Sequence, residues 1–227
     1  MRITFLGHAG FVVEAEGKRV AIDPFLTGNP VAKTKPGELK VDGIVLTHGH
    51  GDHTSDAVAV ALANDCPIVA VVELAALLAR KGAKTVGMNT GGTYEWNGIR
   101  AKMTQAFHSS SYEDEEGQHY AGQAVGVLLT IGGKTLYHTG DTALFSDLKM
   151  IGERHAIDAV ALPIGGHFTM GPDDALDAAT WIGAKQVIPI HYDTFPMLRQ
   201  DGDEFVRRLA ERGMVGHAMK PGDILEL

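Results

Sequence analysis

The chain has 227 residues, a length that suits one large domain or two small ones and suffices to bury a sizeable core. Its apolar (44%) and charged (21%) fractions are ordinary for a globular protein, and its net charge of -8 argues against a chain whose main task is to grip nucleic acid or an anionic membrane. The single cysteine, Cys66, excludes an intrachain disulfide and indicates a reducing compartment.

The N-terminal segment MRITFLGHAGFVVEAEGKRV lacks the long apolar run of a secretory signal. No window of the chain reaches about 18 consecutive apolar residues, the length that a membrane helix needs. We therefore expect a cytoplasmic protein without a membrane span.

The first part of the chain predicts strands. Short runs rich in β-branched and aromatic residues, broken by turns that contain Gly, occur at residues 2–7, 11–15 and 19–23. Residues 26–40 carry Gly, Pro and Lys and predict a loop. Residues 41–47 predict a strand that is apolar enough to be covered on both faces.

The remaining segments alternate between strand and helix patterns. Further strands are predicted at residues 66–72, 98–108, 157–165, 186–192 and 222–227, with a strand hairpin at 124–141. Helices are predicted at residues 55–65, 73–82, 143–155, 171–185 and 203–213. Both halves begin with strand hairpins and end in strand–helix units. This order favours an α/β fold of two mixed sheets with helices on the outer faces, a four-layer αββα sandwich forming a single domain over residues 1–227.

The segment LTHGHGDHT, residues 46–54, places four metal-binding side chains within six positions: His48, His50, Asp52 and His53. Residues two apart in extended backbone share a face, so His48 and His50 can point at one ion. The chain then turns into a helix, which allows Asp52 and His53 to reach a second point. Gly49 and Gly51 add no side chains between these donors and tolerate unusual dihedrals.

Imidazole nitrogens and carboxylate oxygens are ligands that Zn²⁺ accepts, and two ions about 3.5–4 Å apart can share one hydroxide. A His-rich run can also be a weak metal trap on the protein surface. Four donors at a strand-to-helix junction favour a built site over that alternative.

The segment HGHGDH resembles the H-x-H-x-D-H signature of the metallo-β-lactamase superfamily. Three further positions match the family pattern in order: His108 in MTQAFHSSS, Asp141 in LYHTGDT and His191 in VIPIHYD. The resemblance implies that one metal ion is held by His48, His50 and His108, the other by Asp52, His53 and His191, with Asp141 as the bridge. It implies two divalent cations, Zn²⁺ before Mn²⁺, Fe²⁺ or Ni²⁺, which accept similar ligands.

The resemblance covers nearly the whole chain. The segments ITFLGHAGFVVE, VAIDPFLTGNP and PIGGHFTMGP are most similar to a group of small prokaryotic metal-dependent hydrolases related to the L-ascorbate-6-phosphate lactonase branch. The fold that this implies is the αββα sandwich, with the site at one edge of the paired sheets. Position 50 is His rather than the Glu of a di-iron oxygen-reducing branch, and Cys66 occupies no ligand position.

Several residues outside the ligand set are candidates for supporting roles. Asp23 is interpreted as an acceptor that orients the metal-binding loop, or as a turn residue before Pro24. His8 and His167 lie in Gly-rich loops, and the resemblance favours substrate contact for both over a structural role. Asp52 and His8 are the candidates for handling the proton. His138 is interpreted equally well as a core residue or as a support for the metal site. The acidic run at residues 113–118 predicts a solvated loop.

The leading interpretation is a metal-dependent hydrolase that uses a metal-bound hydroxide to cleave a lactone or ester of a small molecule. Phosphodiester cleavage at the same dinuclear site is the alternative, and a β-lactam is a weaker third choice. A non-catalytic metal-binding or scaffold protein is the alternative from another class, and a mononuclear iron enzyme is a further one. We expect a small-molecule substrate, no nucleic acid and no membrane as partners, and homo-oligomers are compatible with the sequence.

Overall fold

The β-branched runs of the chain form two seven-stranded sheets in the computed structural model, which describes residues 1–227. The first sheet contains β1 (Arg2–Gly7), β2 (Gly10–Ala15), β3 (Lys18–Ile22), β4 (Gly43–Val45), β5 (Ile68–Val71), β6 (Thr85–Met88) and β16 (Ile224–Glu226). The second contains β7 (Thr93–Trp96), β8 (Ile99–Gln105), β11 (Val125–Ile131), β12 (Lys134–His138), β13 (Ala159–Pro163), β14 (Gln186–Ile190) and β15 (Val215–Gly216).

The two sheets have the same internal organisation. Their strand orders are β16-β1-β2-β3-β4-β5-β6 and β15-β14-β13-β12-β11-β8-β7. In the first sheet the pairs from β16 to β3 are antiparallel and those from β3 to β6 are parallel. In the second sheet the pairs from β7 to β12 are antiparallel and those from β12 to β15 are parallel. The prediction of two mixed sheets is confirmed.

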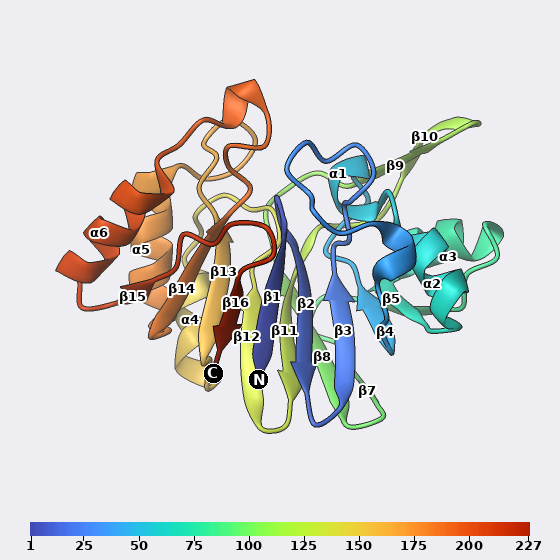
Figure 1. The fold of residues 1–227 in the computed structure, drawn as a ribbon, viewed down its shortest axis with the longest axis horizontal. Coiled ribbons are helices and arrows are strands. Elements are labelled where there is room, and N and C mark those ends of the chain that lie inside the picture. Colours follow the sequence, from blue (N-terminus) through green and yellow to red (C-terminus); the bar gives the residue numbers. More distant parts are fainter.

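Helices cover the outer faces of both sheets. The helices of the chain are α1 (Gly51–Thr54), which lies at the edge of the sandwich, and α2 (Ala57–Asn64), α3 (Val72–Arg80), α4 (Asp147–Arg154), α5 (Pro172–Ile182) and α6 (Gly202–Glu211), with short 3-10 helices at Pro36–Glu38 and Pro196–Leu198. Figure 1 shows α2 and α3 outside the first sheet and α4, α5 and α6 outside the second. This is the four-layer αββα arrangement that the sequence predicts. None of these helices combines the length and apolar character that a membrane span requires.

The side chains of β11 show why the central strands are apolar throughout. Val127 and Leu129 pack in the core between the two sheets, whereas Leu128 between them packs in the core beneath α4, α5 and α6. Successive side chains of a strand point to opposite faces, so both faces of β11 are covered. Each buried aliphatic side chain of this kind contributes about 1.5–3 kcal/mol relative to an exposed one.

The helix predicted at residues 55–65 is present as α2, which begins at Ala57. A separate short helix, α1, precedes it and was not predicted, and Asp56 lies between the two at the start of α2. The buried carboxylate of Asp56 accepts hydrogen bonds from the amides of Leu26 (2.7 Å) and Thr27 (2.8 Å) instead of capping the helix. Asp56 therefore ties the loop of residues 26–40 to the metal-binding segment.

The acidic run at residues 113–118 was wrongly predicted to be a loop. It belongs to a separate hairpin of β9 (Ser111–Asp114) and β10 (Gly117–Tyr120), which projects from the molecule at the upper right of Figure 1. Lys81 contacts Asp114 at 3.0 Å and Glu115 at 2.9 Å. A polar, exposed hairpin lacks the alternating apolar pattern that identifies a strand in sequence. Strands β6, β7 and β15 are short and were also missed.

The direction of the strands explains how distant donors meet. In the first sheet β1, β3 and β4 run the same way, and in the second β8, β12 and β14 do. The candidate functional residues follow the ends of these strands: His8, Asp23, His48, His108, Asp141 and His191. The C-terminal ends of these strands lie at the upper edge in Figure 1. One edge of the sandwich therefore receives all of these side chains.

The two glycines of the metal-binding segment differ in their surroundings. A methyl group at Gly49 would lie 2.7 Å from Cβ of Ala121 and 2.8 Å from the carbonyl oxygen of Ser111, whereas no atom lies within 4 Å of one at Gly51. We expect Gly49→Ala to lower the free energy of unfolding by about 1–3 kcal/mol, the usual cost of overpacking. Gly51→Ala, at the start of α1, should leave it unchanged or raise it by up to about 1 kcal/mol, because Ala favours helix over Gly.

Urea unfolding of the wild type and both variants measures this difference. Equal stability of the two variants would contradict the steric role of Gly49.

Candidate metal centre

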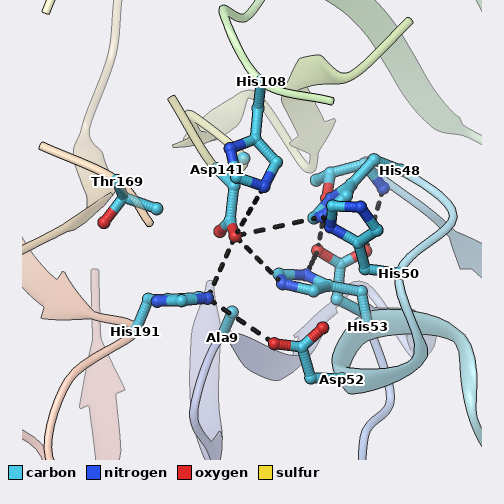
Figure 2. Close-up of polar contacts among 12 residues, drawn as sticks. Ala9, His48, His50, Asp52, His53, His108, Asp141, Thr169 and His191 are labelled. Carbon is cyan, nitrogen blue, oxygen red and sulfur yellow. Dashed lines mark hydrogen bonds and ion pairs between the residues drawn. The ribbon is translucent and has the colours of Figure 1, made fainter. Parts of the chain in front are cut away.

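The first group of donors comes from two loops at the edge of the sandwich. His48 and His50 follow β4, and His108 follows β8. One ring nitrogen of each lies within 4.8 Å of the others, and Nε2 of His48 lies 3.0 Å from Nδ1 of His50. Figure 2 shows the three rings converging from above and from the right. Three imidazoles at this spacing can hold a divalent cation such as Zn²⁺.

The second group lies beside the first. Asp52 and His53 belong to α1 and His191 follows β14, and their donor atoms lie within 4.8 Å of one another together with a ring nitrogen of His8. Nε2 of His191 is 3.7 Å from Oδ2 of Asp52. The short helix α1 places Asp52 beside His8 and His191, whereas the ring of His53 lies between those of His48 and His191, with centroids 4.1 and 5.8 Å apart. The segment therefore contributes donors to both groups, and which cation each donor would hold stays a prediction.

Asp141 lies between the two groups. Its Oδ2 is 3.0 Å from Nε2 of His191, 3.5 Å from that of His53, 3.7 Å from that of His108 and 3.9 Å from that of His48. Figure 2 shows these contacts radiating from a single carboxylate. The carboxylate of Asp141 contacts histidines of both groups, which is the position that a bridging ligand requires.

The donor set fits a bound cation. Nε2 of His53 and Oδ1 of Asp141 are buried and have no hydrogen-bond partner in the protein. A buried polar atom without a partner costs about 1–3 kcal/mol, so such atoms in a native protein call for an explanation. Imidazole and carboxylate donors aimed at a common point give that explanation, because both are ligands of divalent metals.

Burial and mutual contact shift the pKa values of these groups in different directions. Burial lowers the pKa of His48 well below its usual value. Burial also disfavours the charged form of His53, but the carboxylates of Asp141 and Asp23 outweigh it and raise the pKa of that ring well above its usual value. The pKa of His191 rises to about 9, because Asp141 outweighs burial in the same way. Positions at which a carboxylate stabilises a proton on the ring are also positions at which it stabilises a cation.

Asp23 supports the centre through hydrogen bonds to Thr47 and His53. This agrees with the first of the two roles that the sequence suggested for Asp23, an acceptor that orients the metal-binding loop. Its carboxylate is fully buried and accepts hydrogen bonds from the amide of Thr47 (2.9 Å), the hydroxyl of Thr47 (2.6 Å) and Nδ1 of His53 (2.8 Å). His53 therefore carries its proton on Nδ1 and directs Nε2 towards Asp141. Groups that fix the outer nitrogen of a metal-binding histidine in this way orient the ring and raise its basicity.

Thr47 extends this support to His48 and was not identified from the sequence. Its hydroxyl donates to Asp23, so its oxygen accepts from Nδ1 of His48 at 3.0 Å. The proton of His48 is therefore on Nδ1, and Nε2 is free to bind a cation. One carboxylate thus determines the tautomers of two donors. The only local signal was the position of Thr47 immediately before His48.

His8 lies within the cluster but is almost fully buried, at 2% exposure. Its Nε2 donates to Oδ2 of Asp52 at 3.1 Å, and its Nδ1 lies 2.9 Å from the hydroxyl of Thr194, another residue that the sequence did not reveal. Burial lowers the pKa of His8 to about 4, so the ring is neutral near neutral pH. These contacts make His8 a support for Asp52, and substrate contact by His8 stays a prediction.

The structure does not bring His167 into the cluster. His167 is exposed in the loop after β13, and its ring packs against that of the exposed Phe168. A role in substrate contact stays a prediction for this residue. A surface cavity of about 830 Å³ is lined mainly by residues 192–194, 199–203 and 218–221 and shares only His8 with the cluster. It therefore lies beside the seven donors and not over them.

Comparison with known proteins agrees with this geometry. Residues 2–191 match the family described as the Beta-lactamase superfamily domain. The chain is 50% identical over its full length, and over the full length of the relative, to a UPF0173 metal-dependent hydrolase of Geobacillus thermodenitrificans. A UPF0173 metal-dependent hydrolase of Bacillus mycoides is 49% identical over the same extent.

Solved structures show the same similarity. Igni18, a metallo hydrolase of the archaeon Ignicoccus hospitalis, superposes with a TM-score of 0.90 at 34% identity, covering 100% of this chain and 98% of that one. An isothiocyanate hydrolase from Delia radicum gut bacteria shares the fold, with a TM-score of 0.79 at 21% identity and coverage of 100% and 99%. The match over most of the chain and the full-length relatives together show that this chain belongs to the metallo-β-lactamase superfamily, among its UPF0173 metal-dependent hydrolases.

Proposed function

We propose that this metal-dependent hydrolase binds two divalent cations and cleaves a lactone or ester of a small molecule. The observation that carries the dinuclear proposal is the position of Asp141 between two groups of donors. His48, His50 and His108 would hold one cation, and Asp52, His53 and His191 the other. Zn²⁺ is the cation favoured by this set of imidazoles and carboxylates.

The bound cations would supply a Lewis acid for the substrate oxygen and lower the pKa of water towards neutrality. The chain's own residues hold this arrangement. Asp23 and Thr47 keep protons on the outer nitrogens of His53 and His48, and His8 holds one oxygen of Asp52. The side chain of Asp52 is 29% exposed, which allows its carboxylate to pass a proton to solvent.

The substrate class follows from charge and resemblance. The chain carries a net charge of -8, and several of its acidic residues lie in the hairpin next to His108, so a polyanionic substrate is disfavoured. The resemblance to the ascorbate-phosphate lactonase branch favours attack at an acyl carbon. Phosphodiesters are the alternative substrates and should be tested beside lactones and esters, because one fold hosts many reactions. The single buried Cys66 supports a cytoplasmic location.

Replacing Asp141 tests the dinuclear proposal. We expect the wild type to bind two equivalents of Zn²⁺ and Asp141→Asn to lose at least one, because the bridge loses its charge. Asp114→Asn, in the half-buried group of Asp114, Glu116 and His119 away from the centre, is the matched control and should keep both equivalents. Metal content per folded chain, measured by mass spectrometry of the elements, distinguishes these results. Full retention by Asp141→Asn would exclude Asp141 as the bridge.

Binding of Zn²⁺ should also release protons. The pKa values of His53 and His191 lie above their usual value, that of His191 at about 9, so both rings carry an extra proton at neutral pH without a cation. A cation needs the free nitrogen, so its affinity should rise with pH up to about 9 and fall as the pH is lowered. Calorimetry in buffers of different ionisation enthalpy measures the release. Binding without proton release would contradict the assignment of these two ligands.

A panel of lactones, esters and phosphodiesters tests the reaction. Chelation should abolish turnover, and added Zn²⁺ or Mn²⁺ should restore it.

His167→Ala should keep its metal and lower turnover by about tenfold or more if the residue contacts substrate. His8→Ala should lower metal affinity as well, because Asp52 loses its partner. His155→Ala is the control outside the cluster. Two bound cations without turnover on any substrate would favour the scaffold alternative.

A further inference from the structure

His138 is a fully buried histidine at the end of β12 that lies outside the proposed ligand set. Its Nε2 lies 2.8 Å from the carbonyl oxygen of Ala9, and its Nδ1 lies 3.0 Å from the amide nitrogen of Gly140. Ala9 belongs to the turn between β1 and β2 in the first sheet, whereas His138 and Gly140 belong to the second. The ring therefore joins the two sheets at the edge that carries the site.

The two partners of His138 allow only one form of the ring. A backbone carbonyl only accepts, so Nε2 must carry a proton and donate it to Ala9. A backbone amide only donates, so Nδ1 must be free to accept from Gly140. The neutral ring with its proton on Nε2 satisfies both contacts. Burial, which lowers the pKa of His138, favours this same neutral form.

Each partner is adjacent in sequence to a residue of the centre. Ala9 follows His8, which holds Asp52 and whose carbonyl oxygen accepts a hydrogen bond from the amide of His191 at 2.8 Å. Gly140 precedes Asp141 and has a left-handed backbone, with φ of +66°. A side chain at this position would collide with the carbonyl oxygen of Val125. Gly140 therefore has no side chain with which to hold the turn. The turn is held by the hydroxyl of Thr139, which donates to the carbonyl oxygen of Gly140 at 3.0 Å, and by the ring of His138, which accepts from the amide of Gly140.

We propose that His138 is a positioning residue that fixes the turn carrying Asp141 relative to the turn carrying His8. This inference rests on the proposed role of Asp141 as a metal bridge. The ring determines how far the bridging carboxylate lies from Asp52, which reaches the centre from the first sheet. His138 touches neither cation nor substrate and acts through the two turns.

Three replacements separate the two contacts. His138→Leu removes both, His138→Asn retains an acceptor near the position of Nδ1 for Gly140, and His138→Gln retains a donor near the position of Nε2 for Ala9. Tyr137→Phe is the matched control. Tyr137 is the preceding residue on the same strand and is equally buried, but its hydroxyl bonds Thr104 at 3.2 Å and its ring packs in the core beneath α4, α5 and α6.

The first measurement needs no metal. Hydrogen exchange of the Gly140 amide in the metal-free protein should accelerate in His138→Leu and His138→Gln, and should stay close to wild type in His138→Asn and Tyr137→Phe. The second is Zn²⁺ affinity by competition with a chelating indicator, with thermal unfolding recorded in parallel. Affinity should fall by roughly 10- to 100-fold in His138→Leu, the range for residues that orient metal ligands, with partial recovery in His138→Asn and His138→Gln.

A matching change in the visible spectrum of bound Co²⁺ in His138→Leu, absent from Tyr137→Phe, would support altered ligand geometry. An unchanged exchange rate of the Gly140 amide in His138→Leu would overturn the proposal that His138 fixes this turn, whether or not the protein binds metal. A lower unfolding temperature with unchanged Zn²⁺ affinity would also overturn the proposal and make His138 an ordinary core residue. Failure of the wild type to bind Zn²⁺ would instead contradict the proposed function, and the exchange experiment would still decide whether His138 holds the turn.

Discussion

The buried carboxylate of Asp141 is the interaction on which the rest of the site depends. An isolated buried charge costs several kcal/mol, and only close partners of opposite charge and good geometry offset that cost. Here the partners are four imidazole nitrogens from three segments of the chain, at 3.0–3.9 Å from one oxygen. Each segment reaches Asp141 only because both sheets end at the same edge. The centre and the packing of the two sheets are therefore parts of one constraint.

Buried polar groups that would not touch a cation themselves support the donors through hydrogen bonds. Asp23 and Thr47 determine which nitrogen of His53 and of His48 carries a proton, and His8 holds Asp52. His138 joins the turns next to His8 and Asp141 by two backbone hydrogen bonds. A hydrogen bond to Nδ1 of His48 or His53 restrains rotation of the ring, so Nε2 stays directed towards Asp141. The geometry of the donors is thus largely set before a cation arrives, which limits the reorganisation that binding would otherwise require.

The parts of the molecule that surround the centre are built differently. The donors lie next to strand ends, whereas His167 and Phe168 are exposed on a loop and β9 and β10 form a hairpin outside both main sheets. Loops on a rigid scaffold commonly carry substrate recognition, and relatives that share a scaffold differ in such loops. This division agrees with a family whose fold is shared at low identity, as with the isothiocyanate hydrolase at 21%.

The sequence alone determined what depends on local pattern. Alternating and apolar runs identified most strands, and the spacing of His48, His50, Asp52 and His53 identified the metal-binding segment, because donors a few residues apart are neighbours whatever the rest of the chain does. Resemblance then indicated His108, Asp141 and His191. The structure brings these three to the same edge as the segment.

Only the tertiary structure decided the roles that depend on contacts between distant segments. His138 and Ala9 are 129 positions apart, and Thr194 lies 186 positions from His8, so no local pattern could pair them. The break before α2 arises because Asp56 binds the loop at Leu26, which overrides its preference for the helix. Gly49 and Gly51 look alike in the sequence, yet only Gly49 is packed against another segment. Local spacing specifies which side chains can act together, but the packing of one segment on another decides which of them are held and in what form.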